Sequence, residues 1–181
     1  MSVIATLIET TGNEPVTVDE LKTYCHVDQD EEDSLFPTMI KAAREYAEHR
    51  TGRKLVACTY DIVCPTKETI VIPVTPCLVL ASVTVAGEEV TDTSLFTYTP
   101  SAVGGEPVFA TFEPLDGFPD GEITLRVNVG ACTEAEKQWI MVRVNNWYEQ
   151  RATFGIGPNF HEFHHDFVDA LLDITAHYGG F

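Results

Sequence analysis

Apolar residues recur at helical spacing near both ends of the chain and at alternate positions through its middle. Between residues 31 and 51, apolar side chains such as Leu35, Met39 and Ala43 fall three or four apart, which predicts one buried face of a helix. The same pattern recurs in three further segments. The predicted helices span residues 17–26, 31–51, 133–151 and 162–178.

Local signals mark where these helices begin and end. Thr17 with Glu20, and Thr133 with Glu136, have the spacing of a capping box, in which the threonine and the acid satisfy free amides of the first turn. Pro37 is compatible with a helix if Ser34 is the N-cap, because first-turn amides have no partner within the helix. Gly52 is suited to end the second helix.

From residue 55 to residue 129 the hydrophobic period changes to two, and Gly and Pro separate short runs, as in antiparallel strands. The absence of alternating strands and helices argues against a doubly wound nucleotide-binding fold. Ala86-Gly87-Glu88 predicts a turn. The predicted strands are 55–64, 69–72, 78–86, 95–98, 108–112 and 122–129.

The predicted fold class is α+β: a bundle of about four helices with a β-rich antiparallel insert, residues 55–129, between helices 2 and 3. We expect residues 1–15 to form an extended N-terminal arm and residues 179–181 a short tail. Residues 16–178 are expected to form a single domain, and no segment is apolar enough to suggest a membrane span.

Charge changes this picture, because the net charge is −17 and one short region is basic. Residues 37–56 contain five basic and two acidic residues, whereas each of the other regions is acidic. Such a chain is poorly suited to grip nucleic acid through its phosphates. The asymmetry could join a basic patch to an acidic face of a neighbouring copy, or the acids could simply form a solvated surface.

Candidate chemistry is weak. Five cysteines lie far apart without a Cys-x-x-Cys pair, which indicates reduced thiols rather than a disulfide framework or zinc site. His161, His164 and His165 suggest a metal site, but they lack the His-Glu-x-x-His spacing and are more simply a polar helix start. Phosphate-binding and nucleophile motifs are absent from the sequence. We therefore expect no enzyme activity, no metal and no cofactor.

Two helical segments and the elements between them are similar, in their order along the chain, to those of a known protein family. The first is Ala42–Arg53, ending in Thr51-Gly52-Arg53, and the second is Trp147-Tyr148-Glu149-Gln150-Arg151. An opening helix from Thr17, the acidic link 28–33, and Pro73 and Pro76 ahead of Val83-Thr84-Val85 come in the same order. Over residues 16–178 the chain resembles the head–tail connectors, or adaptors, of tailed bacteriophages. Its arm, the region 104–121 and the histidine-rich turn depart from that family.

The resemblance implies a structural virion protein that is made in the host cytoplasm and placed in the neck of the particle. It implies a homo-oligomeric ring, expected to be a dodecamer, that lies beneath the portal protein and offers a platform to the stopper or tail. Double-stranded DNA would pass through the lumen without specific binding, because lumenal carboxylates repel phosphates. A stopper or tail-terminator protein is the alternative, and a metal-dependent enzyme is a more distant one.

The resemblance also suggests which residues make contacts. The C-terminal region is expected to meet the portal, with Phe163, Phe167, Tyr178 and Phe181 as candidates. Ring contacts are expected to pair basic residues of one copy with acids of the next. The basic candidates are Arg44, Arg50, Arg53 and Lys54, and the acidic candidates are Asp30, Glu31 and Glu32.

Overall fold

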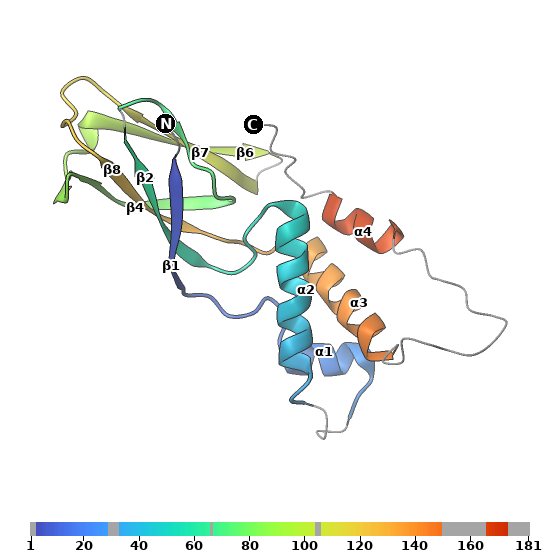
Figure 1. The fold of residues 1–181 in the computed structure, drawn as a ribbon. Coiled ribbons are helices and arrows are strands. Elements are labelled where there is room, and N and C mark those ends of the chain that lie inside the picture. The colour runs from blue at the N-terminus through green and yellow to red at the C-terminus, as the bar shows by residue number, and fades with distance from the viewer. Residues whose placement is uncertain (1–2, 29–32, 66, 104–105, 150–165, 174–181) are drawn as a thin grey trace. The chain divides into compact units, whose positions relative to one another are not determined.

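The computed structural model describes residues 3–28, 33–65, 67–103, 106–149 and 166–173, with side chains for all of these except 102–103, 106–108 and 166–167. These residues form four α-helices and two antiparallel sheets, and most of the strands lie between helices 2 and 3 (Figure 1). The predicted α+β class is confirmed. The helices are α1 (Val18–Cys25), α2 (Phe36–Thr51), α3 (Glu134–Glu149) and α4 (Asp166–Asp173).

Eight strands form the sheets. They are β1 (Ile4–Thr10), β2 (Cys58–Cys64), β3 (Ile70–Val71), β4 (Cys77–Val85), β5 (Glu88–Glu89), β6 (Phe96–Val103), β7 (Glu106–Pro114) and β8 (Ile123–Val129), with a 3₁₀ turn η1 (Thr93–Leu95) before β6. One sheet has the order β1-β2-β8-β4-β5 and the other β3-β7-β6. Each predicted strand has a counterpart, whereas β1 and β5 were not predicted.

The chain divides into two compact units. The β unit consists of residues 1–13 and 56–131, and the helical unit of residues 14–55 and 132–181. The sequence predicted the β-rich region as an insert within one domain and residues 1–15 as an extended N-terminal arm. In the structure, most of that arm is part of the β unit, because β1 pairs antiparallel with β2 from Ile4 to Thr10.

The core of the β unit is built by alternation along its central strands. Ile123, Leu125, Val127 and Val129 of β8 are buried, and the residues between them are more exposed. Phe112, from the other sheet, is fully buried in the same core. The two sheets therefore share one apolar interior, as in a small sandwich.

Two glycines of the β unit are required by geometry. Gly87, at φ 88°, follows Ala86 at φ 50° in the tight β4–β5 connection, and positive φ at both central residues suits a two-residue hairpin loop. Gly130 has φ 101°, and a Cβ there would lie 2.0 Å from the Val56 carbonyl oxygen. Any side chain at Gly130 would therefore displace the backbone of residue 56.

The helical unit has its own core, in which Leu21, Phe36, Ile40 and Trp139 are fully or almost fully buried. Leu172 of α4 is also fully buried there. Packing of one apolar face from each helix accounts for the bundle. The predicted fourth helix, 162–178, lies outside the described residues except for Asp166–Asp173.

Both predicted capping boxes are present. The Thr17 hydroxyl accepts from the Glu20 amide at 3.2 Å, and Thr133 does the same for Glu136 at 3.3 Å. The predicted N-cap of α2 at Ser34 is wrong. Leu35 is the N-cap, without a side-chain hydrogen bond, and Pro37 lies in the first turn, where its missing N–H costs no helical bond.

Candidate functional site

The basic residues predicted to contact a neighbouring copy all lie at or after the C-terminal half of α2, and each already has a carboxylate partner within the helical unit. Arg44 donates from Nε to Glu14 at 2.8 Å, and its Nη1 lies 3.2 Å from Glu48. Lys54 donates to the other oxygen of Glu48 at 3.2 Å. The basic patch seen in the sequence is therefore largely neutralised inside the subunit.

Glu48 is the centre of this network. Its side chain is 8% exposed, and its Oε1 also accepts from the Leu55 backbone amide at 3.0 Å. The Glu48 carboxylate thus interacts with Arg44 and Lys54 and also fixes the backbone that follows α2 at Leu55. A buried carboxylate requires such partners, because an unpaired buried charge is costly.

Arg53 is the most deeply buried of the candidates, since 2% of its side chain is exposed. Its Nε lies 3.2 Å from Oε1 of Glu136, which is itself fully buried. The other oxygen of Glu136 accepts from the Thr133 amide at 2.8 Å, so one carboxylate both caps α3 and faces Arg53. A contact from Arg53 to another copy would require the subunit to open.

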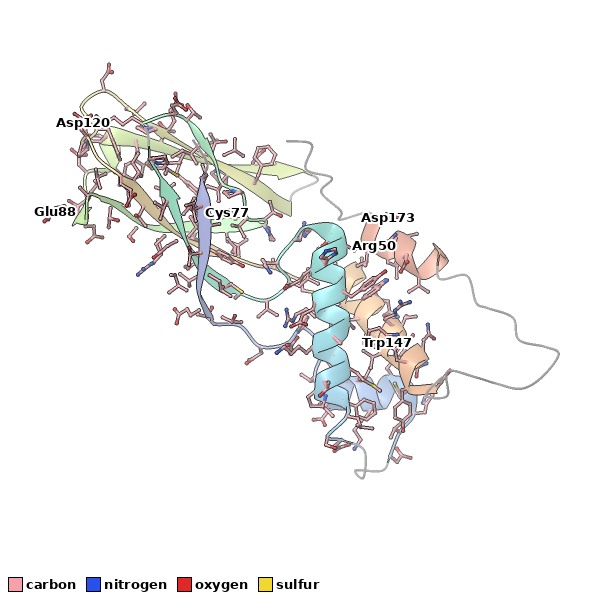
Figure 2. The ribbon with its side chains drawn as sticks, viewed as in Figure 1. Arg50, Cys77, Glu88, Asp120, Trp147 and Asp173 are labelled. Atoms are coloured by element: carbon pink, nitrogen blue, oxygen red, sulfur yellow. The ribbon has the colours of Figure 1, made fainter. Side chains whose placement is uncertain are left out.

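Arg50 connects α2 to α4. It donates to Asp169 at 3.1 Å and to Asp173 at 3.2 Å, and Figure 2 labels Arg50 and Asp173. Asp169 also accepts from the indole N–H of Trp139 at 3.1 Å. Because 35% of the Arg50 side chain and 36% of the Lys54 side chain are exposed, these two remain the basic candidates that a neighbour could reach.

An aromatic cluster with a cation extends along α3. Trp139 stacks on Tyr46 with ring centroids 5.5 Å apart, and the Arg143 guanidinium lies 5.4 Å from the Tyr46 ring and 5.4 Å from the Trp147 ring (Figure 2 labels Trp147). Such cation–π contacts stabilise packing between helices. Trp147 therefore packs through Arg143 within the helical unit.

Glu20 both caps helix α1 and forms an ion pair with Lys137. Its Oε1 accepts from Lys137 at 2.6 Å, and its Oε2 accepts from the Thr17 amide at 2.9 Å. The hydrogen bond from Lys137, followed by those from Thr17, lowers the pKa of Glu20 to about 2. This ion pair joins α1 to α3.

Most of the remaining candidates lie outside the described residues: Asp30, Glu31, Glu32, His161, Phe163, His164, His165, Tyr178 and Phe181. Phe167 is in α4, but its side chain is also outside them. The predictions for these residues remain predictions.

The described residues contain no cluster of His, Cys, Asp and Glu that could hold a metal ion. All five thiols are free, and burial is the main cause that raises the pKa of Cys64 to about 11 and of Cys132 to about 12. Such thiols are poor nucleophiles near neutral pH. None of the described helices is long and apolar enough to cross a membrane.

The β unit contains surfaces that the sequence did not reveal as contact candidates. All seven residues of β1 are exposed, including Ile4, Leu7 and Ile8. At the opposite side of the same sheet, a groove of about 530 Å³ follows β4 and is lined by apolar residues that include Val79 and Phe96. The density of β-branched residues near the N-terminus was the only available signal for β1.

The sequence and the fold were compared with those of known proteins. Residues 15–95 match the family model of the phage gp6-like head-tail connector protein. No curated protein matches the sequence.

Three solved structures have a similar fold. A chain in the neck of an empty gene transfer agent (GTA) particle, computed with C6 symmetry, is 16% identical with a TM-score of 0.63, covering 97% of this chain and 95% of that one. A chain in the virion of a native GTA particle is 15% identical with a TM-score of 0.66, covering 96% and 94%. A chain in the neck of a native GTA particle, computed with C12 symmetry, is 14% identical with a TM-score of 0.58, covering 94% of each.

The structural similarity extends over nearly the whole of each chain, and the family model covers helices α1 and α2 and strands β2 to β5 but not β1. The sequence phrase Ala42–Arg53 lies within the residues that match the family model, whereas Trp147–Arg151 lies outside them. Residues 15–95 are thus similar to the phage gp6-like head-tail connector family, and the fold is similar to that of the GTA chains over nearly the whole length.

Proposed function

We propose that this protein forms a homo-oligomeric ring in the neck of a phage-like particle, between the portal and the stopper or tail. The observation that carries the proposal is the fold similarity over 97% of the chain to a protein in a particle neck, together with the connector family match. The family has a structural rather than an enzymatic role. The ring would extend the DNA channel and offer a docking platform.

Twelve copies would fit best. The similar neck structures were computed with C6 and with C12 symmetry, and twelve copies satisfy both. A closed ring needs two different, complementary surfaces on each copy, because every subunit contacts one neighbour on each side. This requirement directs attention to surfaces that occur in pairs on one subunit.

Charge supports passage of DNA rather than binding to it. The net charge of −17 would repel the phosphates of duplex DNA from an acidic lumen. The basic residues near the end of α2 do not offset this, since Arg44, Arg53 and Lys54 are paired with carboxylates inside the subunit. Tight DNA binding at low salt would contradict this part of the proposal.

Contact with the portal is proposed for the region that includes Phe163, Phe167, Tyr178 and Phe181. Aromatic side chains that enter pockets contribute strongly to binding energy. Replacing Tyr178 and Phe181 by alanine should weaken portal binding by about tenfold or more. Phe109→Ala, which changes a 39% exposed aromatic of the β unit, is the matched control and should leave portal binding unchanged.

The test is electron microscopy of the purified protein mixed with the portal ring encoded in the same genome. A collar of added density with one copy per portal subunit is the expected result. Failure to bind both isolated portals and DNA-filled heads would contradict the adaptor role. Binding to an adaptor-containing neck but not to the portal itself would instead indicate a stopper.

A further inference from the structure

The first edge of the five-stranded sheet is unusually open. β1 is the edge strand, and among the described residues it is paired on one side only, with β2. Ile4, Leu7 and Ile8 are 57%, 49% and 48% exposed, and the strand contains neither Lys nor Pro, which commonly protect such edges. A free strand edge with apolar side chains is a site for pairing with another strand.

The second edge lies on β4, three strands away from β1. The short strand β5 pairs only with Thr84 and Val85, and the Val90 amide donates to the Val83 carbonyl at 2.9 Å. In the described part of the sheet, residues 78–82 of β4 have a partner strand on the β8 side alone. Figure 2 labels Cys77, where β4 begins, and Glu88, where β5 begins.

This second edge forms the floor of a groove. The register of β4 against β8 shifts between Cys77 and Val79 and again between Leu80 and Ser82. The groove of about 530 Å³ runs along this strand, and its lining is mostly apolar. Its lining residues are Leu78–Val83, Glu89, Val90, Thr91, Thr93, Phe96 and Tyr98. Backbone groups along a strand edge with apolar pockets beside them are the features that accept an added strand.

The strand directions make the two edges complementary. The neighbouring pairs β1–β2, β2–β8 and β8–β4 are all antiparallel, so β1 and β4 run in opposite directions. A rotation about a ring axis preserves the direction of each strand relative to that axis. The β1 strand of a rotated copy would therefore meet β4 in the antiparallel sense, without turning the subunit over.

We propose that, in the ring, β1 of one copy lies antiparallel along the free edge of β4 of the next copy, so that neighbouring five-stranded sheets join edge to edge. This inference rests on the proposed ring function, and it identifies the surface that closes the ring. Within one subunit the two edges lie on opposite sides of the sheet, so a subunit cannot satisfy its own β4 edge with β1.

Length and charge fit this pairing. The seven residues of β1 span about 24 Å, and residues 78–82 of β4, which have a partner strand on the β8 side alone in the described part of the sheet, span about 17 Å, so β1 can cover the whole of this stretch. Antiparallel alignment places Glu9, the one charged residue of β1, near the Leu78 end of the groove. Glu89 lies at the other end, so the two carboxylates are kept apart, whereas parallel alignment would bring them together.

A pair of variants tests the two edges separately. Leu7→Lys on β1 and Val79→Lys on β4 each place a charge on an exposed side chain, 49% and 52% exposed, so the subunit should keep its stability. Each variant should raise the concentration needed for ring assembly by about tenfold or more, since a buried unpaired charge opposes association. Val71→Lys, at a 41% exposed position on the other sheet, is the matched control.

Photo-crosslinking identifies the partner. A benzophenone amino acid at position 7, in rings assembled alone or on the portal, should attach to residues 78–83 of another copy. Attachment to position 7 or its neighbours in a second copy would indicate β1–β1 pairing and overturn the proposal. Normal assembly of Leu7→Lys, or attachment elsewhere, would also overturn it. In those cases rings still form and the proposed function stands, whereas a wild-type protein that forms no ring contradicts the function itself.

Discussion

The β unit and the helical unit differ in whether they bury charged side chains. The buried charged residues among those described, Glu48, Arg53 and Glu136, all lie in the helical unit, where they link the helices and the chain that leaves α2. The β unit has an apolar interior and leaves apolar side chains on the free edge of β1. Buried charge therefore holds the helical unit together, whereas the apolar side chains of β1 are left for the pairing between copies that we propose.

The largest expected effect concerns the buried pair of the helical unit. Arg53→Met leaves Glu136 as an uncompensated buried carboxylate and should reduce the free energy of unfolding by about 3–5 kcal/mol. Urea unfolding followed by circular dichroism measures this change. Adding Glu136→Gln, which removes the charge but keeps an acceptor for the α3 cap, should recover a large part of the loss. If Arg53→Met alone costs less than about 1 kcal/mol, the pair does not hold the helical unit together.

The apolar core of the β unit gives the next effect. Leu125 is fully buried on β8, and Leu125→Ala should cost about 2–5 kcal/mol through lost burial and the cavity left behind. Leu115→Ala, at a position 42% exposed in the same unit, is the matched control and should cost under about 1 kcal/mol. If thermal unfolding shows that the two variants lose the same free energy of unfolding, Leu125 is not a core residue of the β unit.

A smaller effect is expected at the start of α3. Thr133→Ala removes the hydroxyl that accepts from the Glu136 amide and should cost about 0.5–2 kcal/mol. Thr91→Ala, at an exposed threonine of the β unit, should be close to neutral in the same chemical denaturation experiment. A neutral Thr133→Ala would mean that Glu136 alone is sufficient to cap the helix.

The smallest expected effect is the contribution of the Glu20 ionisation to stability, which depends on pH. The pKa of Glu20 is lowered to about 2 chiefly by its bond from Lys137, so its stabilising contribution is complete above the ordinary pKa of 4.5 and is lost as the pH falls toward 2. NMR titration of the Glu20 carboxyl carbon measures the pKa directly. Lys137→Met should raise it toward 4.5, and an unchanged value would remove Lys137 as the cause.

The elements of local origin could be predicted from the sequence. The Thr17 and Thr133 capping boxes and the stop at Gly52 depend on residues within one or two turns, and all three are present. β1 was predicted only as an extended arm, because a strand with both faces exposed lacks the alternation that marks a half-buried strand. Its partner β2 lies far away in the sequence.

The partners of the basic candidates within the subunit could not be predicted for the same reason. Composition identified a basic stretch, but the acids that neutralise it come from distant segments, as with Arg53 and Glu136 or Arg50 and Asp169. Charge reversal at Arg53 would consequently test folding rather than assembly. Arg50→Glu is the sharper test of a charged ring contact, because 35% of that side chain is exposed.

Hydrogen exchange measured by mass spectrometry, on the free subunit and on the ring assembled on its portal, tests the central claim most directly. If β1 pairs with β4 of the next copy, assembly should slow exchange of backbone amides in β1 (Ile4–Thr10) and in residues 78–83 of β4, and exchange in the segment 44–54 of the helical unit should be unchanged. Slowed exchange in 28–33 and 44–54, with β1 and β4 unaffected, would contradict this pairing and return the ring contact to the charged residues.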